Sequence, residues 1–362
     1  MFNIGFAIIS AILFGAIALK PAKTKTAATD LTLGQFDGLI SVVVPARNEE
    51  SRIGLLLESL AASGDQNFET IVVDDMSEDR TCEIASGFGV NVIKIDKLKS
   101  EFRGKTNACE IGFQHSIGKV IVFLDADTFV HPNFMSKVRE LFSHPLNQVV
   151  TIQPKSKCVK LFEQLSLFFH ISSVTATGVN SLFPFGFGLY GPCIAMRREA
   201  YVLSHGFANE NVRKSIVEDV ALGEVLEKQN IAIARYAGSG LIQYRMYEKF
   251  STLYLGWKRN IAAGFTKAPI LPSIILVMFY GSLISLPVQI IQERTPLLVA
   301  IFIFELILLF IAGLKLGNYL LGIIFYPLTL FFFMVVFFAS LTTRILRLKT
   351  SWAGRKLEIE KK

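Results

Sequence analysis

The chain has 362 residues, of which 51% are hydrophobic and 31 are phenylalanine, and its mean hydropathy is +0.45. These values are high for a soluble protein and indicate contact with lipid, and the long apolar runs lie at the two ends of the chain. The formal net charge of +7 comes without a block of five or six basic residues or a basic patch interleaved with aromatics, which argues against nucleic acid as a partner.

The first apolar run covers residues 2–19, carries no charge and is long enough to cross a bilayer. No basic segment precedes it, which favours a permanent membrane anchor, assigned to residues 1–20, over a cleaved signal peptide. Lys20, Lys23 and Lys25 follow the run. Because positive residues tend to stay on the cytoplasmic side, we expect the N-terminus outside the cell and the next domain inside it.

Strands and helices alternate in the next part of the chain, which we assign to one domain over residues 38–265. Strands are expected at LISVVVPA, ETIVVDD and VIVFLDAD, and helices at ESRIGLLLESLAAS, DRTCEIASGF and KTNACEIGFQHS. This alternation predicts an α/β fold with a mostly parallel sheet and helices on both faces. Ligands of such sheets bind at the carboxyl ends of the strands.

Polar and acidic residues follow each of the three expected strands. In chain order they are Arg47 and Glu49, then Asp74 and Asp75, then Asp125 and Asp127. Carboxylates gathered at one edge of a sheet repel one another unless a cation is present, and their oxygens suit Mg²⁺ or Mn²⁺ bridging a diphosphate. A single Asp-x-Asp is often only a turn. Here Asp125 and Asp127 come directly after the apolar run VIVFL, so the sequence favours a metal site.

A glycine and a lysine stand at the expected start of one helix, in the segment RGKTNA. Lys105 at a helix N-terminus would suit the diphosphate of a nucleotide. The segment is not a Walker A loop, because the earlier glycine and the strand spacing of that loop are absent. A solvated basic turn is the simpler alternative.

Residues 161–191 are apolar and aromatic but are interrupted by polar residues and glycine. The run is too interrupted for a membrane span. We expect an amphipathic segment at the bilayer surface that forms part of an acceptor channel. An ordinary core helix followed by a glycine-rich loop is the alternative.

Three further apolar runs, 270–291, 297–314 and 319–341, lie in a membrane region assigned to residues 266–343, before a basic tail at 344–362. Three crossings that start from a cytoplasmic domain would place the basic tail outside, against the tendency of positive residues to stay inside. Either one run does not cross, or the tendency is overridden here.

Six motifs occur in order between residues 41 and 233: VVVPARNEE, VVDDMSEDRT, GKTNA, FLDAD, GPCIAMRREAY and VEDVALGEVLEKQNIAI. The ordered set resembles the family 2 glycosyltransferases. This resemblance implies a GT-A fold, which is Rossmann-like, in the 38–265 domain. It also implies an inverting transfer from a nucleotide-sugar donor, assisted by a divalent metal, Mg²⁺ or Mn²⁺.

The resemblance also implies a role for each matching residue. Asp219 looks like the general base, with Glu218 orienting or assisting it, and Asp125 and Asp127 resemble the metal and diphosphate motif. The residues that resemble the nucleotide-binding set are Pro45, Arg47 and Glu49 in the first loop, Asp74 and Asp75 at the base or ribose, and Lys105. Without the resemblance, Glu218 and Asp219 would be read as acidic residues favoured at a helix N-terminus.

One departure from the family pattern concerns the segment after the base. Polysaccharide-forming relatives carry Gln-x-x-Arg-Trp there, whereas this chain has YLGWKR. The missing glutamine argues against a processive polymerase. Trp257 is expected either to stack on the sugar or acceptor or to anchor at the membrane interface, and Arg259 to meet a phosphate.

Together the resemblance and the apolar runs imply transfer of one hexose, with UDP-glucose as the expected donor, to a lipid or carotenoid acid. The expected location is the cell membrane, with several spans and the catalytic domain in the cytoplasm. The expected partners are therefore the lipid bilayer, a UDP-sugar and a lipid or carotenoid acceptor. Transfer to diacylglycerol, a hopanoid or a polyprenyl phosphate is the alternative, and polysaccharide synthesis is less favoured.

Overall fold

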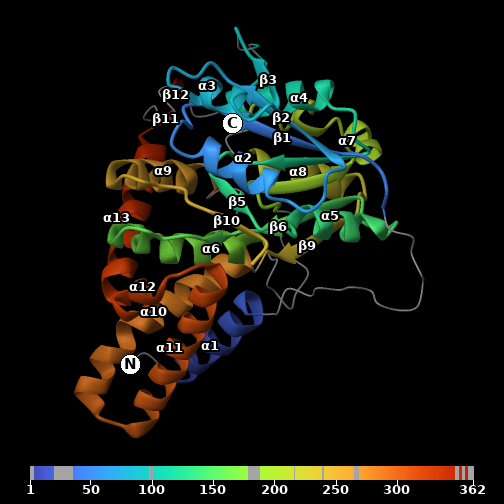
Figure 1. The fold of residues 1–362 in the computed structure, drawn as a ribbon. Coiled ribbons are helices and arrows are strands. Elements are labelled where there is room, and N and C mark those ends of the chain that lie inside the picture. The colour runs from blue at the N-terminus through green and yellow to red at the C-terminus, as the bar shows by residue number, and fades with distance from the viewer. Residues whose placement is uncertain are drawn as a thin grey trace. The chain divides into compact units, whose positions relative to one another are not determined.

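The computed structural model describes most of the chain, and Figure 1 draws it as a ribbon. The described residues are 4–19, 36–97, 99, 101–177, 188–215, 217–238, 240–264, 269–346, 350–352 and 355–357. Lys20, Lys23 and Lys25, on which the expected orientation in the membrane depends, lie outside them. That orientation therefore stays a prediction.

The chain folds as two units, each made of segments that are far apart in the sequence. The α/β unit contains Lys23–Lys155 and Phe187–Arg245, and the helical unit contains Met1–Ala22, Ser156–Gly186 and Met246–Lys362. Two segments that were predicted to belong to the enzyme domain, 156–186 and 246–265, therefore fall in the helical unit. Their apolar side chains pack against other helices of that unit.

The α/β unit is built on a seven-stranded sheet with the strand order β3-β2-β1-β4-β8-β6-β9. Its strands are β1 (Ile40–Ala46), β2 (Phe68–Asp74), β3 (Asn91–Lys94), β4 (Val120–Leu124), β6 (Val149–Gln153), β8 (Cys193–Arg197) and β9 (Ile233–Ala237). Neighbouring strands are parallel except that β8 runs antiparallel to both β4 and β6. The predicted mostly parallel sheet is confirmed.

Helices cover both faces of this sheet, because its central strands are apolar on both sides. Along β1, Val42 and Val44 pack with α2 (Ile53–Ala61) and α5 (Phe134–Ser143), whereas Val43 packs on the other face. The remaining elements of the unit are α3 (Thr81–Ser86), α4 (Gly104–His115), α7 (Arg198–Ser204), η2 (Gly206–Ala208), α8 (Glu218–Lys228) and a small sheet of β5 (Thr128–Val130), β10 (Ile242–Tyr244) and β7 (Lys155–Ser156).

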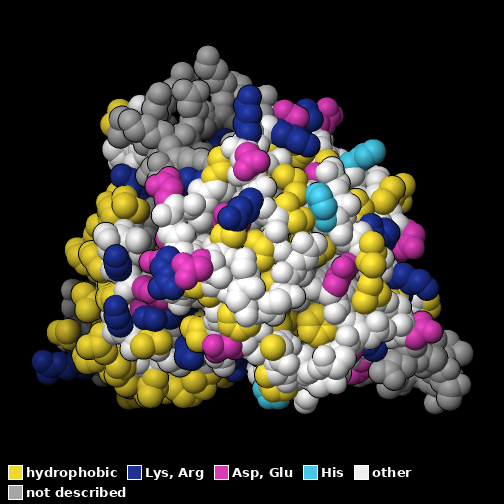
Figure 2. Space-filling model, turned by 45° about the horizontal axis from the view of Figure 1, so that its top comes forward, with side chains coloured by type: hydrophobic (Ala, Val, Ile, Leu, Met, Phe, Trp, Pro, Cys, Tyr) yellow, Lys and Arg dark blue, Asp and Glu magenta, His cyan; other side chains and the backbone are white. Residues whose placement is uncertain are grey.

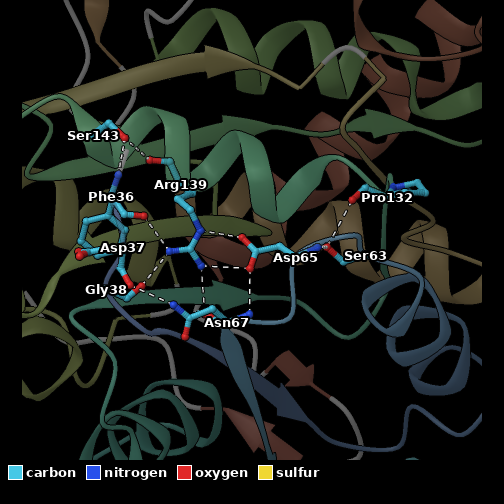
Figure 3. Close-up of polar contacts among 9 residues, drawn as sticks. All are labelled: Phe36, Asp37, Gly38, Ser63, Asp65, Asn67, Pro132, Arg139 and Ser143. Atoms are coloured by element: carbon cyan, nitrogen blue, oxygen red, sulfur yellow. Dashed lines mark hydrogen bonds and ion pairs between the residues drawn. The ribbon is translucent and has the colours of Figure 1, made fainter. Parts of the chain in front are cut away.

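A buried arginine on α5 ties together the chain segments that lead into β1 and β2 (Figure 3). Arg139 donates from Nε and Nη2 to the two carboxylate oxygens of Asp65, at 2.7 and 3.2 Å. It also donates to the carbonyl oxygens of Phe36, Gly38 and Asn67, at 2.8 to 3.0 Å. Hydrogen bonds from Arg139 lower the pKa of Asp65. All five N–H groups of the guanidinium are therefore used.

The helical unit contains three described helices that are long and apolar enough to cross a membrane: α10 (Ile270–Glu293), α11 (Pro296–Leu316) and α13 (Tyr326–Ile345). The first two agree with the predicted runs. The third run is divided, because α12 (Leu320–Ile324) is a separate short helix and Pro327 in the first turn of α13 has no N–H to continue it. The other elements are α1 (Ile4–Ala18), η1 (Leu161–Ser166), α6 (Leu167–Thr177), α9 (Phe250–Gly264), β11 (Thr350–Trp352) and β12 (Arg355–Leu357).

The N-terminal run forms α1, a helix of 15 residues. At about 1.5 Å per residue such a helix is shorter than the roughly 30 Å hydrocarbon core of a bilayer. One side of it is buried, and Phe14 stacks on Phe279 of α10 with 3.8 Å between the ring centroids. In the described residues α1 is thus a helix packed on α10, and a full N-terminal span is not confirmed.

The segment 161–177 differs from the expected surface-lying amphipathic helix. Leu167, Phe168, Phe169 and Ile171 of α6 are all at most 1% exposed. Because these residues point in different directions around the helix, α6 is buried on several sides, as the core-helix alternative predicts for this part of the segment. Within the helical unit, α6 and α9 lie across the direction of α13 (Figure 1). Residues 178–187 of the predicted segment lie outside the described residues, and its place in an acceptor channel stays a prediction.

The charged side chains of both signs are interspersed on the face drawn in Figure 2, and hydrophobic side chains gather along one edge of it. On this face the net charge of +7 is not collected into one basic field. The expected absence of a nucleic-acid partner stays a prediction.

Candidate active site

The carboxyl ends of β1, β2 and β4 lie at one edge of the sheet, because these strands are parallel neighbours. Most of the residues singled out from the sequence stand at this edge: Pro45, Arg47 and Glu49 at the end of β1, Asp74 and Asp75 at the end of β2, and Asp125 and Asp127 after β4. The structure therefore brings these residues together at the edge where parallel sheets bind their ligands.

Hydrogen bonds join the first two of these strand ends. Arg47 donates from Nη1 to the carbonyl oxygens of Asp75 and Met76, at 2.6 and 3.0 Å. The backbone N–H of Glu49 donates to Oγ1 of Thr81 at 2.7 Å. Met76 has a φ of 55°, in the left-handed region. Arg47 thus shapes the loop that is predicted to bind a nucleotide.

Lys105, in the first turn of α4, lies between two carboxylates from other elements. Its Nζ is 2.8 Å from Oδ1 and 3.1 Å from Oδ2 of Asp125, and 2.8 Å from Oε1 of Glu218. Burial disfavours the charge on Lys105, but Asp125 and Glu218 outweigh it and hold the pKa of the ammonium well above its usual value. The lysine therefore joins α4, the end of β4 and the start of α8.

Asp219 follows Glu218 in the first turn of α8. Burial and the neighbouring Glu218 raise the pKa of Asp219 to about 6, although Lys105 opposes the shift. Gly191 lies against this carboxyl group, since a Cβ added to Gly191 would come within 3.0 Å of Asp219 Oδ2. Asp219 is thus a carboxyl group that changes charge near neutral pH, which is the property a general base needs.

Arg52, at the start of α2, belongs to the same site and was not predicted. Its Nη2 lies 2.6 Å from Oε2 of Glu49. Burial raises the pKa of Glu49 to about 8, with Arg52 opposing and Asp127 and Asp125 adding to the rise. Burial raises the pKa of Asp127 to about 6, with a smaller contribution from the charge of Asp125, and Arg52 again opposes the rise. The spacing of Glu49 and Arg52, three residues apart at a helix start, is the signal that identifies such a pair.

Seven charged side chains of the described residues interact electrostatically in one cluster at the strand ends. Five are carboxyl groups (Glu49, Asp125, Asp127, Glu218 and Asp219) and two are cations (Lys105 and Arg52), so full ionisation leaves an excess of three negative charges. The upward pKa shifts of Glu49, Asp127 and Asp219 arise from burial and from repulsion between these negative charges. The cluster is suited to a positively charged ligand or to a proton.

A divalent metal fits this cluster by its donor chemistry. Asp127 Oδ1 is buried and has no hydrogen-bond partner among the described residues. No group of three His, Cys, Asp or Glu side chains in the described residues forms a metal cage by itself. Mg²⁺ is commonly held by one or two carboxylates together with substrate phosphates. Asp125 and Asp127 would hold it in this way, with the remaining ligands coming from a bound diphosphate.

Trp257 and Arg259 lie on α9, in the helical unit. Trp257 is 4% exposed, stacks on Phe169 with 4.8 Å between centroids, and donates from Nε1 to Ser166 Oγ at 3.0 Å. Because one ring face and the N–H are already used inside the unit, stacking on a sugar or acceptor is not supported, and the residue is a core residue here. Arg259 donates to Asn260 Oδ1, and its expected phosphate contact stays a prediction.

Comparisons with known proteins identify the family of the chain. Residues 41–203 match the sequence family described as "Glycosyl transferase family 2". The chain is 30% identical over 261 residues to the 4,4'-diaponeurosporenoate glycosyltransferase of Staphylococcus haemolyticus, which covers 70% of this chain and 69% of that protein. It is 28% identical over 337 residues to the protein of the same name from Staphylococcus aureus, strain USA300, with 89% of each chain covered.

A solved structure shows the same fold over nearly the whole chain. It is a mannosyltransferase from Pyrobaculum calidifontis in complex with GDP-Man and Mn²⁺, with a TM-score of 0.53, 15% sequence identity, and coverage of 94% of this chain and 98% of that one. The likeness concerns the fold. It confirms the predicted class, an α/β unit of GT-A type accompanied by C-terminal apolar helices.

Proposed function

The chain belongs to glycosyl transferase family 2, and we propose that this glycosyltransferase moves a single hexose from UDP-glucose to a carotenoid acid in the membrane. The observation that carries the proposal is the cluster at the strand ends. There Asp219 and Glu218 at the start of α8 are joined through Lys105 to Asp125. A base and a leaving-group site would thus lie in one cluster, close enough to flank the anomeric carbon of a single bound sugar.

The proposed reaction is an inverting displacement at the anomeric carbon. An acceptor oxygen attacks this carbon from one face, and the bond to the nucleoside diphosphate breaks on the other face, so that no enzyme nucleophile is needed. With a hydroxyl acceptor, Asp219 takes the proton that the acceptor loses. Its pKa of about 6 leaves it mostly ionised at neutral pH, and therefore able to accept that proton.

The acceptor class changes what Asp219 contributes. A carotenoid acid is ionised at neutral pH and brings no proton to remove. For such an acceptor, Asp219 would act through its charge and position, and Lys105 would limit its repulsion of the incoming carboxylate. The support for a carotenoid acid comes from the relatives, which bear the name of 4,4'-diaponeurosporenoate glycosyltransferases.

The donor side of the site is proposed to hold a nucleotide sugar with Mg²⁺ or Mn²⁺ at Asp125 and Asp127. When bound, such a metal would stabilise the negative charge that develops on the departing diphosphate. The chain itself would contribute the loop shaped by Arg47 and the buried carboxylate of Asp75, beside the nucleoside. The excess negative charge of the cluster explains why it would bind poorly to a diphosphate alone and well to its metal complex.

The enzyme is proposed to be a multi-pass protein of the cell membrane with the α/β unit in the cytoplasm, where nucleotide sugars are available. Three described helices are long and apolar enough for this role. Addition of a single sugar, and not of a polymer, is supported by the YLGWKR segment, which lacks the glutamine of polysaccharide-forming relatives.

Mass spectrometry of lipid extracts from cells with and without the protein tests the acceptor. We expect a carotenoid acid heavier by one hexose only when the protein is present. A hexosylated diacylglycerol, hopanoid or polyprenyl phosphate would replace the proposed acceptor, and a long saccharide chain would overturn single transfer. In isolated membranes, UDP release from UDP-glucose should require both the acceptor and a divalent metal. Equal turnover in EDTA would remove the metal from the proposal.

A further inference from the structure

Lys105 occupies the position that a cation would need in order to use both oxygens of Asp125. Its Nζ lies 2.8 and 3.1 Å from the two oxygens of Asp125 and 2.8 Å from Glu218. The three hydrogens of an ammonium group match these three oxygens in number. The side chain is 24% exposed, so solvent and ligands can still reach it.

The same carboxylate cannot fully serve a lysine and a divalent metal at once. A metal ligand needs an oxygen lone pair directed at the ion at about 2.0 to 2.1 Å for Mg²⁺. A neighbouring ammonium would then be repelled by the ion. Asp125 must therefore leave Lys105, at least in part, when it binds a metal, and Lys105 then needs a new anionic partner. A diphosphate supplies one.

We propose that Lys105 is a positioning residue that neutralises Asp125 until donor and metal arrive together, and that Glu218 holds the lysine at the start of α8. The inference rests on the proposed function, because it requires a metal at Asp125. It makes binding of the metal and of the nucleotide cooperative: the metal releases Lys105, and the diphosphate gives the lysine a new partner. It also connects the occupied donor site with α8, on which Asp219 lies.

Titration of the purified full chain with Mn²⁺, followed by the electron paramagnetic resonance signal of the free ion, tests this role. In the wild-type protein we expect weak binding without nucleotide and tighter binding with UDP. Lys105→Met should bind Mn²⁺ about tenfold more tightly without UDP, the effect expected for removal of one competing charge-assisted hydrogen bond. UDP should then improve Mn²⁺ binding far less than in the wild type. Lys105→Arg keeps the positive charge and should stay closer to the wild type.

A double-mutant cycle separates direct competition from the general electrostatic field. In Glu218→Gln the lysine has only Asp125 left as a carboxylate partner, so Mn²⁺ binding without UDP should weaken. In the Lys105→Met background the same change should have little further effect, because the lysine through which Glu218 acts is gone. Independent, additive effects of the two substitutions would overturn the inference. If Lys105→Met does not fold, rising Mn²⁺ affinity in Glu218→Gln alone would also overturn it.

The outcomes distinguish this inference from the proposed function. Mn²⁺ that binds wild-type protein and Lys105→Met equally, with the same gain from UDP, overturns the role of Lys105 and leaves the metal role of Asp125 intact. No Mn²⁺ binding to any variant, even with UDP, overturns the metal role and the inference with it. Thermal unfolding of each variant shows that the comparison is made between folded proteins.

Discussion

Two clusters of charged residues in the α/β unit use the same side-chain types in opposite ways. At Arg139 one guanidinium meets one carboxylate, Asp65, and three carbonyl oxygens, so every N–H is used and the charges balance (Figure 3). At the carboxyl ends of the strands, Lys105 and Arg52 face five carboxyl groups. The charges of the first cluster are compensated within the folded chain, whereas those of the second are not.

The pKa values of the two clusters record this difference. Hydrogen bonds from Arg139 lower the pKa of Asp65, whereas burial raises the pKa of Glu49 to about 8 and of Asp219 to about 6. A shift toward the charged form contributes to the stability of the fold, and a shift away from it reduces stability. Because the fold tolerates this destabilisation at the strand ends, the strand-end cluster is expected to serve function and not stability.

The largest expected effect is on catalysis, from Asp219→Asn. With a hydroxyl acceptor, loss of a general base should slow transfer by about 10² to 10⁴-fold. UDP binding should be unchanged, because Asp219 is not placed at the nucleotide. Rates of UDP release and the affinity for UDP, measured on the same membranes, check both statements.

The matched control for this change is Glu227→Gln, an exposed position on the same helix, which should transfer at the wild-type rate. Normal turnover of Asp219→Asn with a hydroxyl acceptor would exclude it as the base. With an acid acceptor the loss should be smaller, since no proton is removed. Comparison of the two acceptors therefore separates the base role from the positional one.

The next largest effect is on stability, from Arg139→Met. Removing one partner of a buried ion pair leaves Asp65 uncompensated, which costs about 3 to 5 kcal/mol. The free energy of unfolding should fall by that amount, while turnover per folded molecule stays close to the wild type. Arg139→Met combined with Asp65→Asn should be less destabilising than Arg139→Met alone. A double variant that is as unstable as the sum of both changes would contradict the pairing.

Local sequence patterns were sufficient to predict the strands that build the site, because β1, β2 and β4 are apolar runs that end in polar residues. The partners of those polar residues were not predictable in the same way. Gly191 lies against Asp219, more than 25 residues away in the sequence. Lys105 contacts Glu218, which is more than 110 residues away. Only the tertiary fold brings these positions together. The burial of Trp257 on α9 was not predictable either, because it depends on Phe169, far from it in sequence.

A smaller effect concerns the pH dependence of stability, which should have opposite signs for the two clusters. The folded state keeps protons on Glu49, Asp127 and Asp219 that the unfolded chain releases near pH 4, so the thermal midpoint should rise as pH falls from about 8 to about 5. Asp65 has a lowered pKa, so its contribution should be lost only below about pH 4.

Differential scanning calorimetry across this range measures the midpoint, which moves about 2 to 4 °C for each kcal/mol in a domain of this size. Glu49→Gln should flatten the upper part of the curve, and Asp65→Asn the acidic part. A midpoint that rises steadily from pH 5 to pH 8 would mean that the strand-end carboxyl groups are already compensated in the folded chain, and would remove the contrast between the clusters.

The smallest expected effect comes from Gly191→Ala. The added methyl group would lie 3.0 Å from Asp219 Oδ2, so the carboxyl group must move by a few tenths of an ångström. Since a displacement of about 1 Å can cost about 10²-fold in rate, this smaller shift should slow transfer by less than about tenfold. Gly64→Ala, where an added Cβ has open space, is the matched control and should keep the wild-type rate. If both variants transfer equally well, the site tolerates movement of its base, and the strand-end cluster is less rigidly arranged than the Arg139 cluster.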